Sequence, residues 1–187
     1  VEAVYESAAM ALATEPEERE RVMSRDEEEV ADRHERYRAF LRSDPGGAWV
    51  ADDGGAIVGG AIALKREKLW VLSLFAVEES RRGKGVGREL LDHALSRGEG
   101  CEAGMIASST HPAAMRSYAV AGFTLHPTLT AEGFVRREQI PTTLPIREGE
   151  SADLALAAGL SLKPDGPICV KGKPGPLFPY LPSEPYL

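Results

Sequence analysis

The sequence predicts a mixed α/β fold of the α+β kind, in which a mostly antiparallel central sheet is flanked by helices. Three apolar segments, at 48–51, 57–64 and 69–77, follow one another with short turn sequences between them, which is typical of antiparallel strands. Apolar residues then recur at helical spacing in 86–95 and in 113–121. The chain has 187 residues, 43% of them apolar, which is enough for one ordinary domain with its own core.

The composition argues against several classes of protein. No run of about 18 uncharged apolar residues is present, so we expect no membrane span, and Glu2 and Glu6 argue against a signal peptide. A net charge of −7 disfavours nucleic-acid binding, which depends on a basic surface. Two cysteines, Cys101 and Cys169, cannot form a disulfide framework or, by themselves, a zinc site. We therefore expect a cytoplasmic protein without a bound metal.

Two helices are predicted before the strands. The first is indicated only by apolar residues at helical spacing near the N-terminus. The second follows a capping-box pattern at Ser24 and Glu27, and the sequence Asp-Pro-Gly-Gly at 44–47 ends it. Its predicted apolar stripe consists of Val30, His34, Tyr37 and Leu41. The acidic residues 26–29 are interpreted as a solvated first turn, in preference to a patch that binds a cationic substrate.

The three strands differ in their predicted positions. The first two, 48–51 and 57–64, are joined by a hairpin turn with the sequence Asp-Asp-Gly-Gly at 52–55. The Gly59-Gly60 pair allows a bulge or the close approach of another segment. The third strand, 69–77, is apolar on both faces, so we expect it at the centre of the sheet.

Helices and strands then alternate. The helix 86–95 is expected to end at Gly98, and a strand is expected over 102–108. Pro112 suits the first turn of the next helix, and Gly122 precedes the last strand of the core. The predicted order is therefore helix, helix, three strands, helix, strand, helix, strand.

The C-terminal part of the chain differs from the core in composition. Seven of the 13 prolines lie in residues 164–187, so this stretch is predicted to be a proline-rich tail, a coil without chemistry of its own. We accordingly predict a core domain over residues 1–141 and a C-terminal extension over residues 142–187.

The glycine-rich stretch after the third strand carries the clearest chemical signal. Its sequence is Arg82-Gly83-Lys84-Gly85-Val86-Gly87-Arg88. Glycines let the backbone turn tightly with several N–H groups pointing in one direction, and the start of a helix adds its own N–H groups. These features predict a cradle for an anion the size of a pyrophosphate. The glycine spacing fits neither the dinucleotide pattern G-x-G-x-x-G nor the P-loop pattern.

The loop resembles the acyl-CoA loop of the GNAT superfamily of N-acyltransferases, whose pattern R-x-x-G-x-G is met by Arg82, Gly85 and Gly87. A second pattern of that family, N-x-x-A-x-x-x-Y-x-x-x-G-F, is matched downstream. The matching residues are Ala114, Tyr118, Gly122 and Phe123, and His111 replaces the usual Asn. The resemblance covers about residues 1–135, and it makes the core domain an expected acyltransferase.

The resemblance also has implications for the sheet. It implies that the sheet splays between the family's fourth and fifth strands, which correspond here to 69–77 and 102–108. The family's first strand is missing at the N-terminus. Residues 144–158 resemble the start of a second GNAT domain, which indicates a tandem protein whose second domain is cut short. Alternatively, this segment supplies the missing edge strand.

The chemistry implied by the resemblance is the transfer of an acetyl group from acetyl-CoA to a primary amine. The amine attacks the thioester directly while both substrates are bound, and Tyr118 protonates the departing thiolate as the general acid. Backbone groups of the third strand contact the pantetheine arm, and the loop holds the pyrophosphate. The implied co-substrate contacts are Phe75, Ala76, Val77, Arg82, Gly83, Lys84, Gly85, Val86, Gly87, Arg88 and His111.

The sequence leaves alternatives open for the general base, for the acceptor and for the activity itself. Glu67, Glu78 and Glu79 flank the third strand without a convincing position for a base, and His111 is interpreted first as a neighbour of the helix N-terminus. The acceptor is a small-molecule or peptide amine, and a homodimer is compatible with the resemblance. The alternative function is a catalytically silent domain that binds acyl-CoA as a sensor.

Overall fold

The structure is a computed structural model that describes residues 27–134, 155–156 and 158–173. The chain divides into two compact units, Val1–Ile106 and Ala107–Leu187. The first predicted helix, the capping residue Ser24 and most of the segment 144–158 lie outside the described residues. The missing first strand and the tandem arrangement therefore stay predictions. Among the described residues, no helix is long and apolar enough to cross a membrane.

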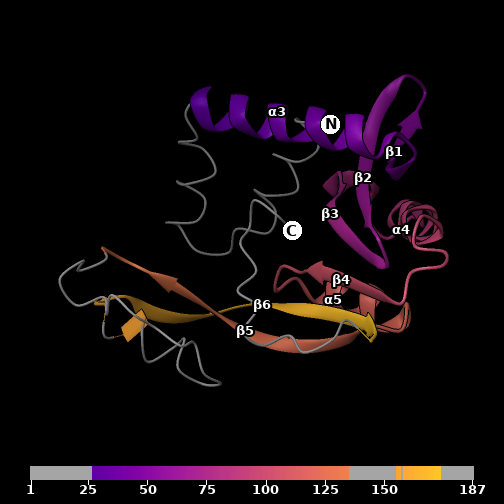
Figure 1. The fold of residues 1–187 in the computed structure, drawn as a ribbon. Coiled ribbons are helices and arrows are strands. Elements are labelled where there is room, and N and C mark those ends of the chain that lie inside the picture. Colours follow the sequence, from indigo (N-terminus) through magenta and orange to yellow (C-terminus); the bar gives the residue numbers. More distant parts are fainter. Residues whose placement is uncertain (1–26, 135–154, 157, 174–187) are drawn as a thin grey trace. The chain divides into compact units, whose positions relative to one another are not determined.

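The first unit contains the predicted antiparallel strands and the helices around them (Figure 1). Its elements are α3 (Glu27–Ser43), η1 (Pro45–Gly47), β1 (Ala48–Asp53), β2 (Ala56–Arg66), β3 (Leu69–Val77), η2 (Glu79–Arg81), α4 (Val86–Ser96) and β4 (Ala103–Ala107). β1 pairs with β2 and β2 with β3 in antiparallel fashion, whereas β3 and β4 are parallel. From α3 onward the predicted order of elements is confirmed, and so is the central position of β3; the first predicted helix stays a prediction.

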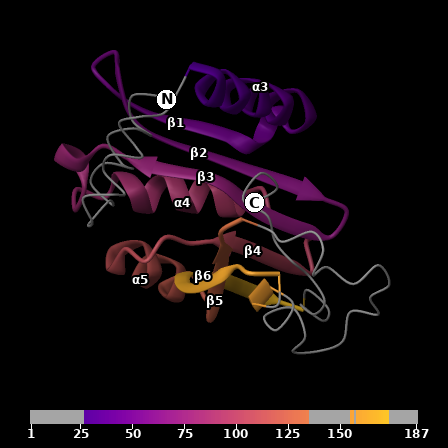
Figure 2. The same cartoon turned by 90° about the vertical axis from the view of Figure 1, so that its left-hand side faces the viewer.

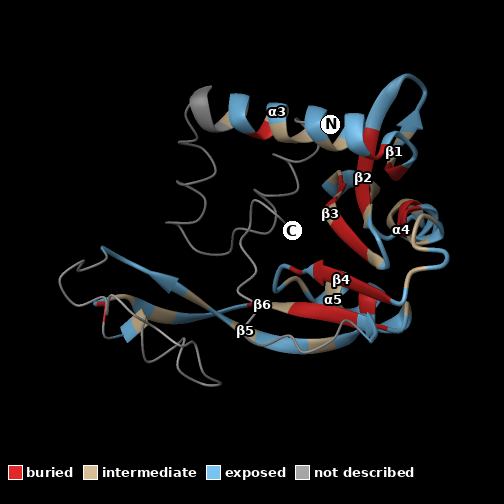
Figure 3. Cartoon of the chain, in the orientation of Figure 1, coloured by how far each residue is buried: buried red, intermediate tan, exposed pale blue. Residues whose placement is uncertain are grey.

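The helices α3 and α4 lie on opposite faces of the β1–β2–β3 strands (Figure 2). Tyr37 and Phe40 of α3 pack against a cluster of Ile62, Leu64 and Leu74 on one face. The predicted stripe of α3 was wrong at its last position, because Leu41 is 46% exposed and Phe40 takes its place. Figure 3 shows buried residues along β2 and β3, as expected for strands covered on both faces.

A bulge in β3 decides which of its side chains face α4. The register with β2 shifts at Ser73, which is an extra residue in β3. Before the bulge, Trp70 faces α4, because its indole N–H donates to the carbonyl of Ala94 at 2.9 Å. After the bulge, Phe75 also faces α4, because its ring lies 3.6 Å from the Cβ position of Gly87. Regular alternation would place Trp70 and Phe75 on opposite faces.

The pairing between β3 and β4 covers only the first part of β3. Leu69 to Leu72 pair with Ala103 to Ile106, and β3 then continues to Val77. The ladder therefore covers one end of β3 only, and the last part of β3 has no partner in β4; the splay between the family's fourth and fifth strands stays a prediction.

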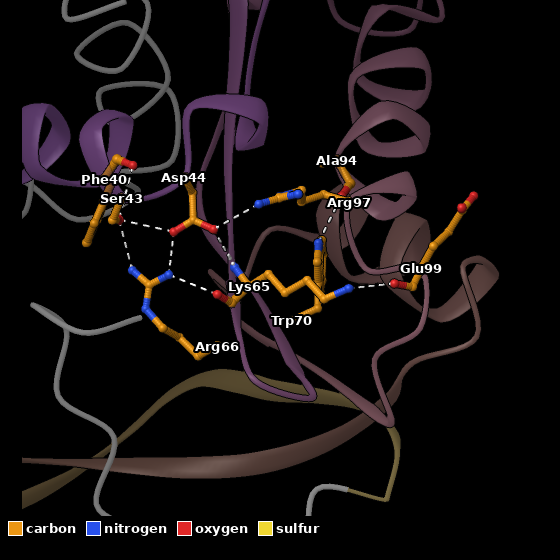
Figure 4. Close-up of polar contacts among 9 residues, drawn as sticks. All are labelled: Phe40, Ser43, Asp44, Lys65, Arg66, Trp70, Ala94, Arg97 and Glu99. Carbon is orange, nitrogen blue, oxygen red and sulfur yellow. Dashed lines mark hydrogen bonds and ion pairs between the residues drawn. The ribbon is translucent and has the colours of Figure 1, made fainter.

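A buried carboxylate ties together three segments of the first unit (Figure 4). Asp44, which is 3% exposed, accepts hydrogen bonds from the Lys65 backbone N–H at 3.0 Å and from the Ser43 hydroxyl at 3.1 Å. It also pairs with Arg66, and with Arg97 at 3.4 Å. Burial by itself would raise the pKa of Asp44, but these hydrogen bonds and the charge of Arg66 hold the pKa below its ordinary value. The end of α3, β2 and the segment after α4 are thus joined at one point.

The second unit is built from a helix and a two-stranded ladder. Its elements are α5 (Pro112–Val120), β5 (Thr124–Glu132) and β6 (Ser161–Gly172), and β5 pairs with β6 in antiparallel fashion. The predicted boundary between residues 141 and 142 stays a prediction, because both residues lie outside the described part of the chain.

The prediction of a coil from residue 164 is wrong for residues 164–172, which belong to β6. The apolar run Ile168 to Val170 is buried and pairs with β5. The preceding prolines do not prevent the strand, because the register shifts beside Pro167 and its carbonyl accepts the Ser108 N–H at 3.0 Å. A Cβ on Gly166 would lie 1.7 Å from the carbonyl oxygen of Ser108, so glycine permits this close approach.

Candidate active site

The glycine-rich loop joins the end of β3 to the start of α4. Gly83 and Gly85 have φ of 73° and 90°, in the left-handed region that glycine adopts without strain. Gly85 is the N-cap residue of α4 and offers no side chain for capping. Helix geometry leaves the N–H groups of the first turn, from Val86 onward, without carbonyl partners inside the helix. Flanking residues aside, no heavy atom in the described part of the chain lies within 4 Å of the Cβ position of Gly83 or Gly85, so the loop is open on that side.

The base of the loop is tied to the sheet. The N–H of Glu78 donates to the carbonyl of Val58 at 2.9 Å, which extends the β2–β3 ladder. The side chain of Arg82 turns back to the end of β3, where its Nε donates to the carbonyl of Val77 at 3.2 Å. In this structure Arg82 therefore braces the loop, and its role as a pyrophosphate contact stays a prediction.

The basic side chains of the loop have different surroundings. Arg81 pairs with Asp53 from the β1–β2 hairpin, with Nη2 and Oδ2 at 2.5 Å. Arg88 is 89% exposed and lies 4.0 Å from Asp92, one turn further along α4. Lys84 is exposed and makes no ion pair with any residue of the described part. Lys84 and Arg88 are thus the loop cations that an incoming anion can approach most easily.

The Tyr118 motif is a helix C-cap. The N–H of Phe123 donates to the carbonyl of Tyr118, and the N–H of Gly122 donates to that of Ala119, both at 3.0 Å. With Gly122 at a φ of 89°, this is the Schellman arrangement that ends many helices. Lys171 of β6 donates to the carbonyl of Ala121 at 2.8 Å and closes the same helix end. The spacing Y-x-x-x-G-F therefore has a local structural reason.

Tyr118 is buried in the second unit, with 5% of its surface exposed. Burial raises the pKa of Tyr118 well above its ordinary value, and the neighbouring Cys169 adds to the rise. Burial likewise raises the pKa of the Cys169 thiol to about 11, against a smaller lowering by a hydrogen bond from Ser108. The Tyr118 phenol therefore keeps its proton at neutral pH, as a proton donor must.

The predicted site residues fall into two groups. Phe75 to Arg88 are contiguous in the first unit, whereas Tyr118 and His111 belong to the second. His111 is the N-cap residue of α5, but its side chain makes no capping hydrogen bond. Sequence reasoning missed Asp53, which reaches the loop only because the hairpin turn and the loop lie at the same end of the sheet.

No metal site is indicated in the described part of the chain, where no group of three or more His, Cys, Asp or Glu side chains could hold an ion.

The structure thus combines a mixed α+β fold with a glycine-rich loop that joins the end of β3 to the start of α4. Residues 10–123, more than half of the chain, match the model of the acetyltransferase (GNAT) family. The chain therefore belongs to this family, whose enzymes transfer acetyl groups from acetyl-CoA to amine acceptors.

Solved structures support the fold. The Ard1 protein from Thermoplasma volcanium is 20% identical with a TM-score of 0.52, over 91% of this chain and 89% of that one. The yncA protein from Salmonella typhimurium, whose structure contains its cofactor acetyl-CoA, is 17% identical with a TM-score of 0.53, over 91% of this chain and 84% of that one. Among curated proteins, no sequence matches this chain.

Proposed function

We propose that the chain is an N-acetyltransferase that binds acetyl-CoA and a primary amine together, and that the amine attacks the thioester directly. The observation that carries the proposal is the open loop between β3 and α4, which lies within the part of the chain that matches the family. Holding the two substrates in a reactive arrangement is a large part of what such an enzyme must contribute.

The loop has the features that a pyrophosphate requires. Gly83 and Gly85 leave room for phosphate oxygens against the backbone, and the N–H groups at the start of α4 are donors for an anion. Lys84 and Arg88 add positive charge in an otherwise acidic protein. The residues present therefore fit the diphosphate of acetyl-CoA, which enters the reaction as a substrate.

The strand β3 is proposed to hold the rest of acetyl-CoA. Its last part, beyond the pairing with β4, includes Phe75, Ala76 and Val77, whose backbone groups we assign to the pantetheine arm. A backbone N–H in this stretch would stabilise the negative charge that develops on the thioester oxygen. Tyr118 is proposed to protonate the thiolate that leaves, since a phenol holds its proton at neutral pH. His111, which takes the place of the motif's Asn, is proposed as a further contact.

Replacing Gly85 by tryptophan is expected to weaken acetyl-CoA binding at least tenfold, because an indole would fill the proposed phosphate cradle. Gly100→Trp is a matched control: Gly100 also has a positive φ, 79° against 90° for Gly85, and it lies beyond the other end of α4. Calorimetric titration with acetyl-CoA measures the effect, and separate titrations with NADH and ATP serve as controls. Unchanged affinity in Gly85→Trp would show that the loop does not hold the pyrophosphate.

The acceptor is proposed to be a small-molecule or peptide amine. The net charge of −7 favours a cationic acceptor in a general way. Release of the CoA thiol, measured across a panel of amines, would identify the acceptor class. A chain that binds acetyl-CoA but releases no thiol with any amine would point instead to the silent, acyl-CoA-binding alternative.

A further inference from the structure

We infer that Asp53 is a positioning residue for the proposed acetyl-CoA loop and that it acts through Arg81. The inference rests on the proposed function of that loop. Asp53 Oδ2 lies 2.5 Å from Arg81 Nη2. Asp53 is the last residue of β1, and Arg81 is the last residue of η2, just before the glycines. The ion pair therefore joins the β1–β2 hairpin to the first limb of the loop.

The sheet topology brings the hairpin and the loop together. β1 and β2 are antiparallel, and the start of β2 lies beside the end of β3, because Gly59 pairs with Val77. The turn between β1 and β2 and the loop after β3 consequently lie at the same end of the sheet. The pairing of Asp53 with Arg81 is thus a consequence of strand order rather than of sequence proximity.

The loop needs anchors at both ends because its middle has little packing. Apart from their own chain neighbours, no described residue has a heavy atom within 4 Å of the Cβ positions of Gly83 and Gly85. The far end is fixed by α4, whose Leu90 and Leu91 are buried. The near end is held by backbone hydrogen bonds in η2, by the bonds from Glu78 to Val58 and from Arg82 to Val77 described above, and by the pair between Arg81 and Asp53. Among the described residues, this is the ion pair that links the near end to another strand.

The ion pair is expected to affect the loop more than the folding of the chain. The Arg81 side chain is 39% exposed and that of Asp53 is 52% exposed, and exposed ion pairs contribute little to stability. Without the pair, the first limb of the loop samples more conformations. Ordering it around a bound pyrophosphate then costs more free energy.

Electrostatics alone predicts the opposite effect of removing Asp53, namely tighter binding of acetyl-CoA. Asp53 places a negative charge near the site proposed for an anion, so its removal should strengthen anion binding through simple electrostatics. Asp52 is the matched control. It carries the same charge one residue earlier, its Oδ1 accepts the Gly55 N–H at 2.8 Å, and it forms no ion pair with any described residue. If acetyl-CoA binding is weakened by the substitution of Asp53 but not by that of Asp52, the effect therefore comes from the positioning of the loop.

Titration with acetyl-CoA tests the inference. Asp53→Asn is expected to raise the Kd about five- to tenfold, whereas Asp52→Asn should leave the Kd unchanged or lower it. The Asp53→Arg variant combined with Arg81→Asp restores the pair with reversed charges and should recover most of the affinity. In an active chain, the KM for acetyl-CoA should rise in Asp53→Asn while kcat stays within about twofold. A Kd for Asp53→Asn at or below that of Asp52→Asn would overturn the inference.

Hydrogen exchange of the free chain separates this inference from the proposed function. Peptides that cover residues 79–86 should exchange faster in Asp53→Asn than in Asp52→Asn, whether or not acetyl-CoA binds. If the native chain failed to bind acetyl-CoA, the proposed function would be lost, while this difference in exchange would still support the role of Asp53 in holding the loop. Equal exchange in the two variants would refute that role even in a chain that binds acetyl-CoA.

Discussion

Tyr118→Phe is expected to lower kcat by about 100-fold or more, since general acid catalysis typically contributes a factor of that size. The change removes only the hydroxyl, so the buried aromatic ring of α5 is retained. The affinity for acetyl-CoA should stay close to that of the native chain. Steady-state kinetics with a thiol-release assay measures kcat, and calorimetry measures the affinity.

Tyr37→Phe is the control for this experiment. Tyr37 lies on α3 and packs against Ile62, Leu64 and Leu74 in the first unit, so the same atom is lost outside the proposed chemistry. Its kcat should stay within about twofold of the native value.

Because burial raises the pKa of Tyr118, its phenol stays protonated up to at least about pH 10. Ionisation of Tyr118 should therefore cause no loss of native turnover below pH 10. Any decline in that range should also occur in Tyr118→Phe. Undiminished turnover in that variant would exclude Tyr118 as the general acid.

Asp44→Ala is expected to lower the free energy of unfolding by about 3 kcal/mol, through loss of a buried charge and its hydrogen bonds. Lys65 would keep a backbone N–H without its acceptor, and Arg66 and Arg97 would lose their shared partner. The estimate lies at the low end for a buried ion pair, because the two arginines are partly exposed and can turn to water. For a chain of this length the midpoint of thermal unfolding should fall by about 6–12 °C.

The pH dependence gives this prediction a second test. The pKa of Asp44 is lower in the folded chain than in the unfolded chain, where it is about 3.9. Its contribution to stability is therefore full above about pH 4 and is lost as the pH falls through the lowered folded-state value. The stability difference between native chain and Asp44→Asn should be largest near neutral pH and should shrink below pH 4.

Glu35→Ala serves as the comparison for Asp44. Glu35 also pairs with two arginines, Arg42 and Arg38, but its side chain is 63% exposed. Removing Glu35 should leave the unfolding midpoint nearly unchanged, because water replaces exposed partners readily. Equal effects of Glu35→Ala and Asp44→Ala would contradict a special role for the buried carboxylate.

The parts of the fold that follow from local sequence were predictable. The strands of the β1–β2–β3 meander, the loop glycines and the helix start at Val86 all depend on residues close together in the chain. The same holds for the end of α5, where the spacing between Tyr118 and Gly122 forms a helix cap from neighbouring residues.

The strand β6 could not be recognised from composition, because its prolines dominate the local pattern. Ile168 to Val170 form a strand only because β5 supplies a partner for pairing. The bulge at Ser73 is equally invisible in the sequence of β3, since an extra residue is defined only against the register of β2.

The sequence by itself determined the class of fold, the family motifs and the position of the loop that opens α4. These features depend on hydrophobic periodicity and on backbone conformations that glycine alone adopts easily. Tertiary structure alone decided what the isolated charges do: that Asp44 is buried between arginines from two segments, and that Asp53 meets Arg81. Strand order brings these charges together from distant positions in the chain. The sequence around a charged residue in a turn does not indicate which residue will be its ion-pair partner.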